Sequence, residues 1–303
     1  MANLKDIKHR IKSVAGTQQI TRAMKMVAAA KLRRSQDALF KLRPFSDGVA
    51  TLLARFLPQS IGDEHPLLVT REDIRSRLMV VITGDKGLCG AFNQNILRYT
   101  ETALAECAGC PTELVTIGRK GFVYFRKAEV NLRTHFEDIY DSLSFITAIN
   151  IARAVEKAFV EGEVDEVLVA YSHFVSPIEQ RVTVLPLLPL RLENIHKAAA
   201  AGSRAARDIE IPAKEEREVY LFEPDVISLC NDLLSRYLAG ELFRAILENV
   251  ASEHGARMTA MDAATGNASD LIDRLTLEYN RARQASITTE IIEVASGAEA
   301  IKE

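Results

Sequence analysis

The distribution of proline constrains this chain more than any other feature. All nine prolines lie between Pro44 and Pro224. Proline in a helix interior costs about 3 kcal/mol, so the two flanking stretches are free to form long helices. We therefore divide the chain into an N-terminal helix (residues 1–56), a central domain (57–224) and a C-terminal helix (225–303).

The first helix is predicted from about residue 3 to residue 56, which corresponds to roughly 80 Å. Pro44 is expected to kink it. Its apolar side chains recur every three or four residues and form one stripe. The stripe comprises Leu4, Ile7, Ile11 and Val14 and, after a phase shift, Ile20, Met24 and Val27.

The stretch from Asp225 to about residue 298 repeats this spacing, and as one helix it would span roughly 110 Å. Such lengths indicate a coiled coil in which the two apolar stripes bury one another. Phase slips in both stripes predict a pairing that departs from strict heptads. The second stripe comprises Leu229, Leu233, Tyr237, Leu242, Ile246, Val250, Leu271, Leu275, Ala282, Ala285 and Ile292.

The middle of the chain has a different pattern, in which short apolar runs alternate with helical periodicity. The runs at 78–83, 114–117 and 166–171 are predicted strands, and 93–106, 119–127 and 144–161 are predicted helices. This alternation predicts a small α/β sheet with parallel strands. The alanine-rich and charged segment 194–217 is expected to form an exposed loop or a weak surface helix, within a longer surface loop at about 191–217.

The first helix is strongly basic, although the net charge of the whole chain is −3. A solvated face, a nucleic-acid contact, a mitochondrial transit peptide and an acidic protein surface each account for such an excess. A low aromatic content of 6% and a pI near 6.1 disfavour nucleic acid. The apolar stripe outlasts a removable peptide, so we favour an acidic protein partner. The basic residues are Lys5, Lys8, Arg10, Lys12, Arg22, Lys25, Lys31, Arg33, Arg34, Lys41 and Arg43.

Two short motifs suggest chemistry, and both are better explained structurally. The stretch from Gly84 to Gly90 follows a strand and precedes a helix, as phosphate loops do, but it lacks the Gly-Lys-Ser/Thr ending. We interpret it as a tight turn that requires positive φ angles. Cys107 and Cys110 have redox or zinc spacing, but they follow a helix instead of starting one. We interpret them as ordinary thiols.

Other catalytic patterns are missing from the sequence. The six histidines are scattered, and neither a nucleophile elbow nor a paired-carboxylate motif occurs. We therefore predict no catalytic, cofactor-binding or metal-binding residues. Four cysteines without a secretory signal indicate a reducing compartment, and no apolar run is long enough to cross a membrane.

The two ends of the chain carry longer motifs. The first reads Lys12-Ser13-Val14, then Thr17-Gln18-Gln19-Ile20-Thr21-Arg22-Ala23-Met24-Lys25-Met26-Val27-Ala28-Ala29-Ala30-Lys31-Leu32-Arg33. The last reads Tyr279-Asn280-Arg281-Ala282-Arg283-Gln284-Ala285-Ser286-Ile287-Thr288-Thr289-Glu290, with Ser296-Gly297-Ala298. With Asp85-Lys86-Gly87-Leu88-Cys89-Gly90 and Tyr220-Leu221-Phe222-Glu223-Pro224-Asp225, they resemble the gamma chains of F-type ATP synthases along the whole chain.

This resemblance implies an antiparallel coiled coil of the terminal helices with a central Rossmann-like α/β domain. It also implies a non-catalytic rotor shaft, one copy per complex, inside a ring of three alpha and three beta subunits. The globular end would rest on the epsilon subunit and the c ring, so that proton flow drives ATP synthesis or ATP hydrolysis drives pumping. The complex would lie on the cytoplasmic face of the bacterial inner membrane, without membrane insertion of this chain.

By the same resemblance, particular residues acquire roles. Contacts with alpha and beta are expected at Met24, Arg257, Gln284, Thr288 and Glu290, although Met24 also fits the apolar stripe. Contacts with the c ring and epsilon are expected at Tyr220 and Glu223. The segment 192–217 is longer than in short bacterial members, and it carries no cysteine pair of the chloroplast type, so thiol regulation is not predicted.

Two other classes of protein remain as alternatives. One is a redox or nucleotide-binding enzyme built on the α/β domain, which would use Cys107 and Cys110 or the Gly84 turn. The other is a basic coiled-coil adaptor for nucleic acid.

Overall fold

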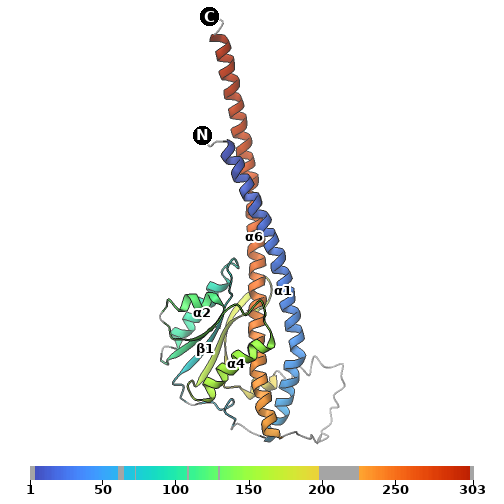
Figure 1. Cartoon of the computed structure of the whole chain (residues 1–303), viewed down its shortest axis with the longest axis vertical. Helices are drawn as coiled ribbons and strands as arrows, with labels where there is room; N and C mark the ends of the chain where they lie inside the picture. Colours follow the sequence, from blue (N-terminus) through green and yellow to red (C-terminus); the bar gives the residue numbers. More distant parts are fainter. Residues whose placement is uncertain are drawn as a thin grey trace. The chain divides into compact units, whose positions relative to one another are not determined.

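A computed structural model describes residues 4–60, 65–71, 73–107, 109–128, 130–197 and 225–300. Residues 192–197 form a short helical turn, and the rest of the predicted surface loop lies outside the described residues. The remaining elements are α1 (Leu4–Ser60), β1 (Arg77–Ile82), α2 (Phe92–Glu106), β2 (Thr112–Ile117), α3 (Arg119–Phe125), β3 (Leu132–Phe136), α4 (Phe145–Val160), β4 (Glu166–Phe174), β5 (Gln180–Leu188) and α6 (Val226–Ala300) (Figure 1).

The chain forms two compact units, which we describe separately. The sheet unit contains residues Ala30–Ala256, and the helix-pair unit contains Met1–Ala29 with Arg257–Glu303. Each long helix therefore contributes to both units. The terminal helices and the central α/β domain confirm the predicted fold class, and α1 continues through Pro44 to Ser60.

The sheet has five strands in the order β3-β2-β1-β4-β5. β1 pairs in parallel with β2 and β4, and β2 pairs in parallel with β3. The three predicted strands are therefore parallel as expected, whereas β5, which was not predicted, is antiparallel to β4. A tight turn between Ser176 and Glu179 returns the chain directly, and an edge position tolerates Pro186 within the strand. Neither edge strand has a long, fully buried apolar run, which explains why both were missed.

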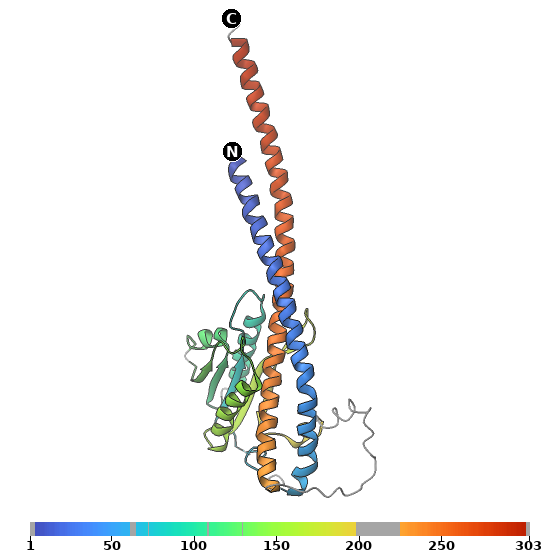
Figure 2. The ribbon, with the colours of Figure 1, turned by 45° about the vertical axis from the view of Figure 1, so that its right-hand side comes forward.

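Alternate side chains of β1 face two different hydrophobic clusters, as the two-residue period of a strand requires. Leu78, Val80 and Ile82 pack in a large cluster with residues of α1, α4 and α6. Met79 and Val81 pack in a smaller one with α2 and α3. The sheet is therefore the middle of three layers, and α1 and α6 run alongside each other within the first (Figures 1 and 2).

In the helix-pair unit, α1 and α6 meet along a regular seam. Its positions alternate in spacings of four and three residues, which is a strict heptad pattern, and all are buried or half-buried. On α1 they are Ile7, Ile11, Val14, Gln18, Thr21, Lys25 and Ala28; on α6 they are Met261, Thr265, Ala268, Ile272, Leu275, Tyr279, Ala282 and Ser286.

This regular seam corrects the predicted apolar stripes and their phase shifts. Ile20 and Val27 are 62% and 57% exposed, and Leu271 and Ile292 are also exposed. Polar residues such as Thr21 occupy seam positions between the apolar ones, so a pattern built from apolar residues alone changes face. The heptad spacing continues on α1 in the sheet unit through Leu32, Ser35, Leu39, Leu42, Ser46, Val49, Leu53 and Phe56.

Candidate partner interface

The C-terminal part of α6 exposes apolar side chains that the described part of the chain does not cover. Two contacts fix the antiparallel pairing with α1: the Thr265 hydroxyl lies 2.8 Å from that of Thr21, and Lys25 pairs with Asp262 over 2.6 Å. In this register, Leu4, the first described residue of α1, is level with a position near residue 282 of α6. All residues from 287 to 297 are exposed.

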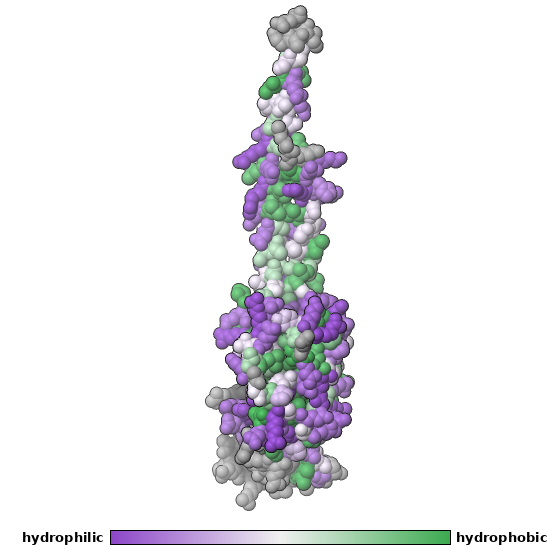
Figure 3. All heavy atoms as spheres, turned by 90° about the vertical axis from the view of Figure 1, so that its left-hand side faces the viewer, coloured by the Kyte–Doolittle hydropathy of each residue, from purple (hydrophilic) through white to green (hydrophobic). Residues whose placement is uncertain are grey.

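Four large apolar side chains lie in this exposed stretch. Ile287, Ile291, Ile292 and Val294 are 48%, 63%, 59% and 73% exposed, and apolar surface is visible between hydrophilic groups there (Figure 3). Burying each would contribute about 1.5–3 kcal/mol, so a contiguous group of this kind indicates a partner surface. Apart from Ile292, which was assigned to the stripe, sequence reasoning missed these residues. A heptad assignment that included polar seam positions would have placed these residues beyond the part of α6 that pairs with α1.

The predicted contact residues near this end are exposed. Gln284 and Thr288 are one helical turn apart on the same face, and the Thr288 hydroxyl donates to the Gln284 carbonyl over 2.9 Å. Glu290 points from a different side of α6, and its carboxylate accepts from the Ser286 hydroxyl at 3.2 Å. The structure therefore brings Gln284 and Thr288 together and leaves Glu290 on a separate face.

Met24 and Arg257 are half-buried in the other half of the helix-pair unit. Met24 lies beside the seam and level with residues near Asp262. Along α6, Arg257 lies about one and a half helical turns before the level of Met24, and Gln284 lies roughly 30 Å after it. The five predicted residues thus form two separate groups. Tyr220 and Glu223 lie outside the described residues.

Charge is divided unequally between the two helices of the pair. On α1, Lys8, Arg10, Lys12 and Arg22 are exposed, with Asp6 as the one acid of its described part in this unit. On α6, exposed acids and bases are mixed: Asp270, Asp273 and Glu278 with Arg274, Arg281 and Arg283. Of the predicted basic residues, Lys25 and Lys31 are half-buried and pair with Asp262 and Asp141, and the others are exposed. A basic face of this kind favours an acidic partner, and the attraction falls with ionic strength.

The turn after β1 occupies the place where a Rossmann-like sheet binds nucleotides, between the strands at which the order reverses. Here the Gly84 amide donates to Asn93 Oδ1 over 2.9 Å, and the Arg119 amide donates to Asp85 Oδ1 over 2.8 Å. The Glu253 carboxylate packs against Gly84 so closely that a Cβ there would lie 2.8 Å from it. Carboxylates thus stand where a phosphate would be received, and they would repel one.

This close approach places a second demand on the turn, besides the predicted positive φ angles, which are present. The positive φ angles belong to Leu88 and Gly90, and Gly84 is required because Glu253 leaves no space for a side chain. Gly118 meets both demands, because its φ is 96° and an added Cβ would lie 2.1 Å from the carbonyl oxygen of Thr83.

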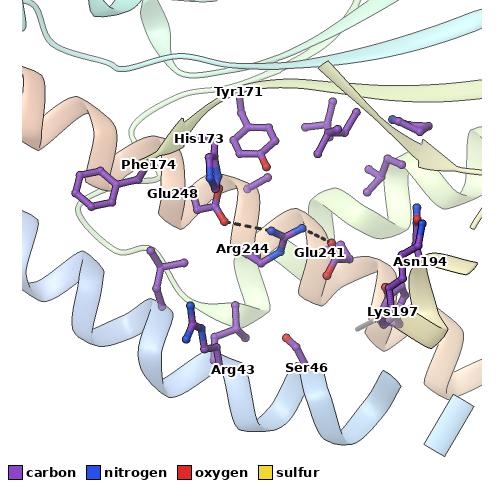
Figure 4. A pocket seen from close by; sticks show the side chains of 18 of the residues that line it. Arg43, Ser46, Tyr171, His173, Phe174, Asn194, Lys197, Glu241, Arg244 and Glu248 are labelled. Carbon is purple, nitrogen blue, oxygen red and sulfur yellow. Dashed lines mark hydrogen bonds and ion pairs between the residues drawn. The ribbon is translucent and has the colours of Figure 1, made fainter. Parts of the chain in front are cut away.

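A cavity of about 850 Å³ lies in the sheet unit between α1, β4, β5 and α6 (Figure 4). Arg244 in its wall binds Glu241 over 2.6 Å and Glu248 over 3.2 Å, and His173 Nδ1 lies 2.5 Å from Glu248. Burial alone would lower the pKa of Arg244, but the two carboxylates raise it; burial and Glu248 raise the pKa of Tyr171. His173 of β4 is thus joined to Glu248 and Arg244 of α6, so we interpret this network as fixing α6 against β4.

Two further observations bear on the class of protein. Among the residues that the structure describes, no group of three or more His, Cys, Asp or Glu could hold a metal ion. Within the same residues, no helix is both long and apolar enough to cross a membrane.

Comparisons with known proteins agree along the whole chain. A family model described as "ATP synthase" matches residues 3–301. The chain is 45% identical to the ATP synthase gamma chain of Anaeromyxobacter sp. (strain Fw109-5) and 44% identical to that of Geobacter sp. (strain M21), with 100% of each chain covered.

A solved structure gives the same result. The central stalk and c-ring structure of the Tetrahymena thermophila mitochondrial ATP synthase contains a chain that is 27% identical. The match has a TM-score of 0.60 and covers 81% of this chain and 99% of that one. A Euglena gracilis ATP synthase chain is 19% identical with a TM-score of 0.64, covering 98% and 94%, and supports the fold. This chain belongs to the ATP synthase gamma chain family.

Proposed function

We propose that this chain is the rotor shaft of an F-type ATP synthase. It turns with a c ring and transmits that rotation to three catalytic beta subunits, so that proton flow is coupled to ATP synthesis or hydrolysis. The family assignment supports the role, and the Tetrahymena relative is named as part of a central stalk with a c ring.

The observation that carries this proposal is the uncovered end of α6. Residues 287–297 are exposed in this chain and include four large apolar side chains. These side chains leave apolar surface in contact with water, which is unfavourable, so burying them against a partner would lower the free energy. The alpha and beta subunits of a surrounding ring would cover it from several sides.

Coupling then requires unequal contacts, because a partner shifts a conformational equilibrium only by binding its states differently. Gln284 and Thr288 lie on one face of α6 and Glu290 on another. A turning shaft would present these faces in sequence to each beta subunit. We propose that Met24 and Arg257 form a second contact region along the pair, roughly 30 Å and 40 Å from Gln284.

We propose that Tyr220 and Glu223 contact the epsilon subunit and the c ring. In this account the shaft helices are residues 1–56 and 225–303, and residues 57–224 form the central domain. One copy serves each complex, which lies peripherally on the cytoplasmic face of a bacterial inner membrane. The bacterial relatives support that location.

We also propose that this subunit has no catalytic site of its own. The position at which a Rossmann-like sheet would hold phosphates is filled by Glu253 and Asp85. Purified chain should therefore show no ATP turnover, while turnover should appear once alpha and beta are added. ATP turnover that remains with the isolated chain through every purification step would contradict this.

The rotor role is tested in a reconstituted complex by ATP-driven proton pumping. Gln284→Ala and Arg257→Ala should reduce pumping per ATP hydrolysed severalfold while leaving the thermal stability of the free chain nearly unchanged. Lys157→Ala, at a 72% exposed side chain of α4, is the matched control and should pump normally. Normal pumping by both test variants would remove these residues from the proposed contacts.

A further inference from the structure

Four cysteines are present, and they fall into two contrasting pairs. Cys89 and Cys230 are buried, whereas Cys107 and Cys110 are half-exposed. Cys89 is further held by Asn93, whose amide lies 3.2 Å from its sulfur, and burial raises the pKa of the Cys230 thiol. Reaction with a water-soluble reagent therefore favours Cys107 and Cys110.

The backbone holds these two residues close together. The amide of Cys110 donates to the carbonyl of Cys107 over 2.9 Å, directly after the end of α2. A hydrogen bond between the first and fourth residues of a turn keeps their Cα atoms within about 7 Å. Disulfides join Cα atoms separated by about 4.4–6.8 Å, so little movement is needed to close a bond here.

The neighbouring strands anchor this turn on its far side. The Arg77 amide donates to the Pro111 carbonyl over 2.9 Å, and the Thr112 hydroxyl donates to the Cys110 carbonyl over 3.2 Å. Arg77 itself is fixed by Glu166, whose Oε2 lies 2.7 Å from its Nε. The turn is thus held in place by β1 and β2 instead of hanging free.

Arg77 also brings a positive charge to the region of this turn, because its backbone is bonded to Pro111. Its pKa is raised first by the hydrogen bond to Glu166, and thiolates at Cys107 and Cys110 raise it further. The end of α2 offers no helix N-terminus to this pair, and Arg77 is the positive group whose backbone is bonded next to the turn.

We propose that Cys107 and Cys110 are a dithiol site that closes to an intramolecular disulfide on meeting a small disulfide of the glutathione class. One cysteine thiolate attacks a sulfur of glutathione disulfide, forms a mixed disulfide and releases one glutathione thiolate. The second cysteine attacks the protein sulfur of that mixed disulfide and releases the other glutathione. The protein loses two electrons and two protons, which the oxidant gains as two glutathione thiols.

The test uses the full chain, first reduced and then incubated with glutathione disulfide at several ratios to glutathione. After acid quenching, unfolding and alkylation, peptide mass spectrometry should show that Cys107 and Cys110 have lost two hydrogen atoms. Cys89 and Cys230 should remain alkylated. In Cys107→Ser, Cys110 should instead carry glutathione. A wild-type product with glutathione on each cysteine, or a disulfide that includes Cys89 or Cys230, would overturn the proposal.

A second measurement separates the turn from chance encounter along the chain. The equilibrium constant for closing the bond should be at least tenfold larger in the folded chain than in concentrated urea, and equal constants would overturn the role of the turn. Arg77→Gln should slow closure several-fold, while Arg77→Lys, which keeps the charge, should react close to the wild-type rate. Equal rates in all three chains would overturn the role of Arg77.

Discussion

The two units of this chain are stabilised in different ways. The sheet unit buries long apolar side chains on both faces of its sheet, including Phe125, Phe159 and Leu234 at 1% exposure or less. The helix-pair unit has a narrow seam in which Thr21, Lys25 and Thr265 take places that apolar residues usually hold. Several of its large apolar residues face outward instead. The difference indicates that one unit is stabilised by its own core and the other by contacts with partners.

Loss of a core side chain should give the largest effect and should be confined to the sheet unit. Phe159→Ala removes a ring that is 1% exposed, and we expect it to lower the free energy of unfolding by about 3–5 kcal/mol. Urea unfolding monitored by circular dichroism measures this. Ile291→Ala in the helix-pair unit is the control and should change stability by less than about 0.5 kcal/mol. Similar losses in both variants would break the comparison.

Acid should weaken the sheet unit through Asp165. Its carboxylate binds Arg71 and the amides of Arg75 and Ser76 at 2.5–2.9 Å, and the Arg71 guanidinium lowers the pKa of Asp165 below its usual value of 3.8. This contribution to stability is complete above the pKa of the unfolded chain and is lost as pH falls through the lowered pKa.

Asp165→Asn should therefore cost about 2 kcal/mol at neutral pH. It should also flatten the fall in stability below about pH 4, because the titrating carboxylate has been removed. Chemical unfolding at a series of pH values measures both effects. An unchanged acid dependence in the variant would show that other carboxylates are responsible.

In the helix-pair unit, removing polar groups from the seam should increase stability slightly. Thr21→Val with Thr265→Val keeps the shape of both side chains, and we expect a gain of about 0.5–1 kcal/mol in thermal unfolding. Thr276→Val, at an exposed threonine of α6 with a similar bond to the helix backbone, is the control and should change little. A loss of stability in the double variant would mean that the seam depends on its hydroxyl groups.

The smallest effect is expected at the ion pair of the same seam. Lys25 and Asp262 have side chains that are 40% and 62% exposed, so their pairing should contribute only about 0.2–1 kcal/mol. A double-mutant cycle with Lys25→Ala and Asp262→Ala measures this coupling, which should decline further in 1 M salt. A larger, salt-independent coupling would contradict the view that this unit is weakly held by itself.

The same contrast explains what could be predicted from the sequence. The buried strand β1 and the proline-free helices follow directly from local pattern. β3 and β5 could not be recognised because edge strands are partly solvated and need no continuous apolar run. The seam was misread because two of its positions, Thr21 and Thr265, are polar and contact each other. The need for glycine at position 84 could not be recognised because Glu253, far along the chain, fills the space beside it.

Among the candidate site residues, Gln284, Thr288 and Glu290 were predicted from the resemblance to ATP synthase gamma chains, which does not explain why they are exposed. Their exposure follows from where α1 stops covering α6, which depends on the register of the pair and not on any single motif. Ile287 and Ile291 are recognisable as interface residues only once that register is known.

The central claim is that partner subunits enclose the uncovered end of α6. Hydrogen exchange of the amides in residues 287–297 tests this most directly, with the free chain compared against the chain assembled with alpha and beta subunits. We predict that exchange in this stretch slows at least tenfold on assembly, while β1, already buried in the sheet unit, changes little. Equal exchange of residues 287–297 in the free and assembled chain would contradict the account.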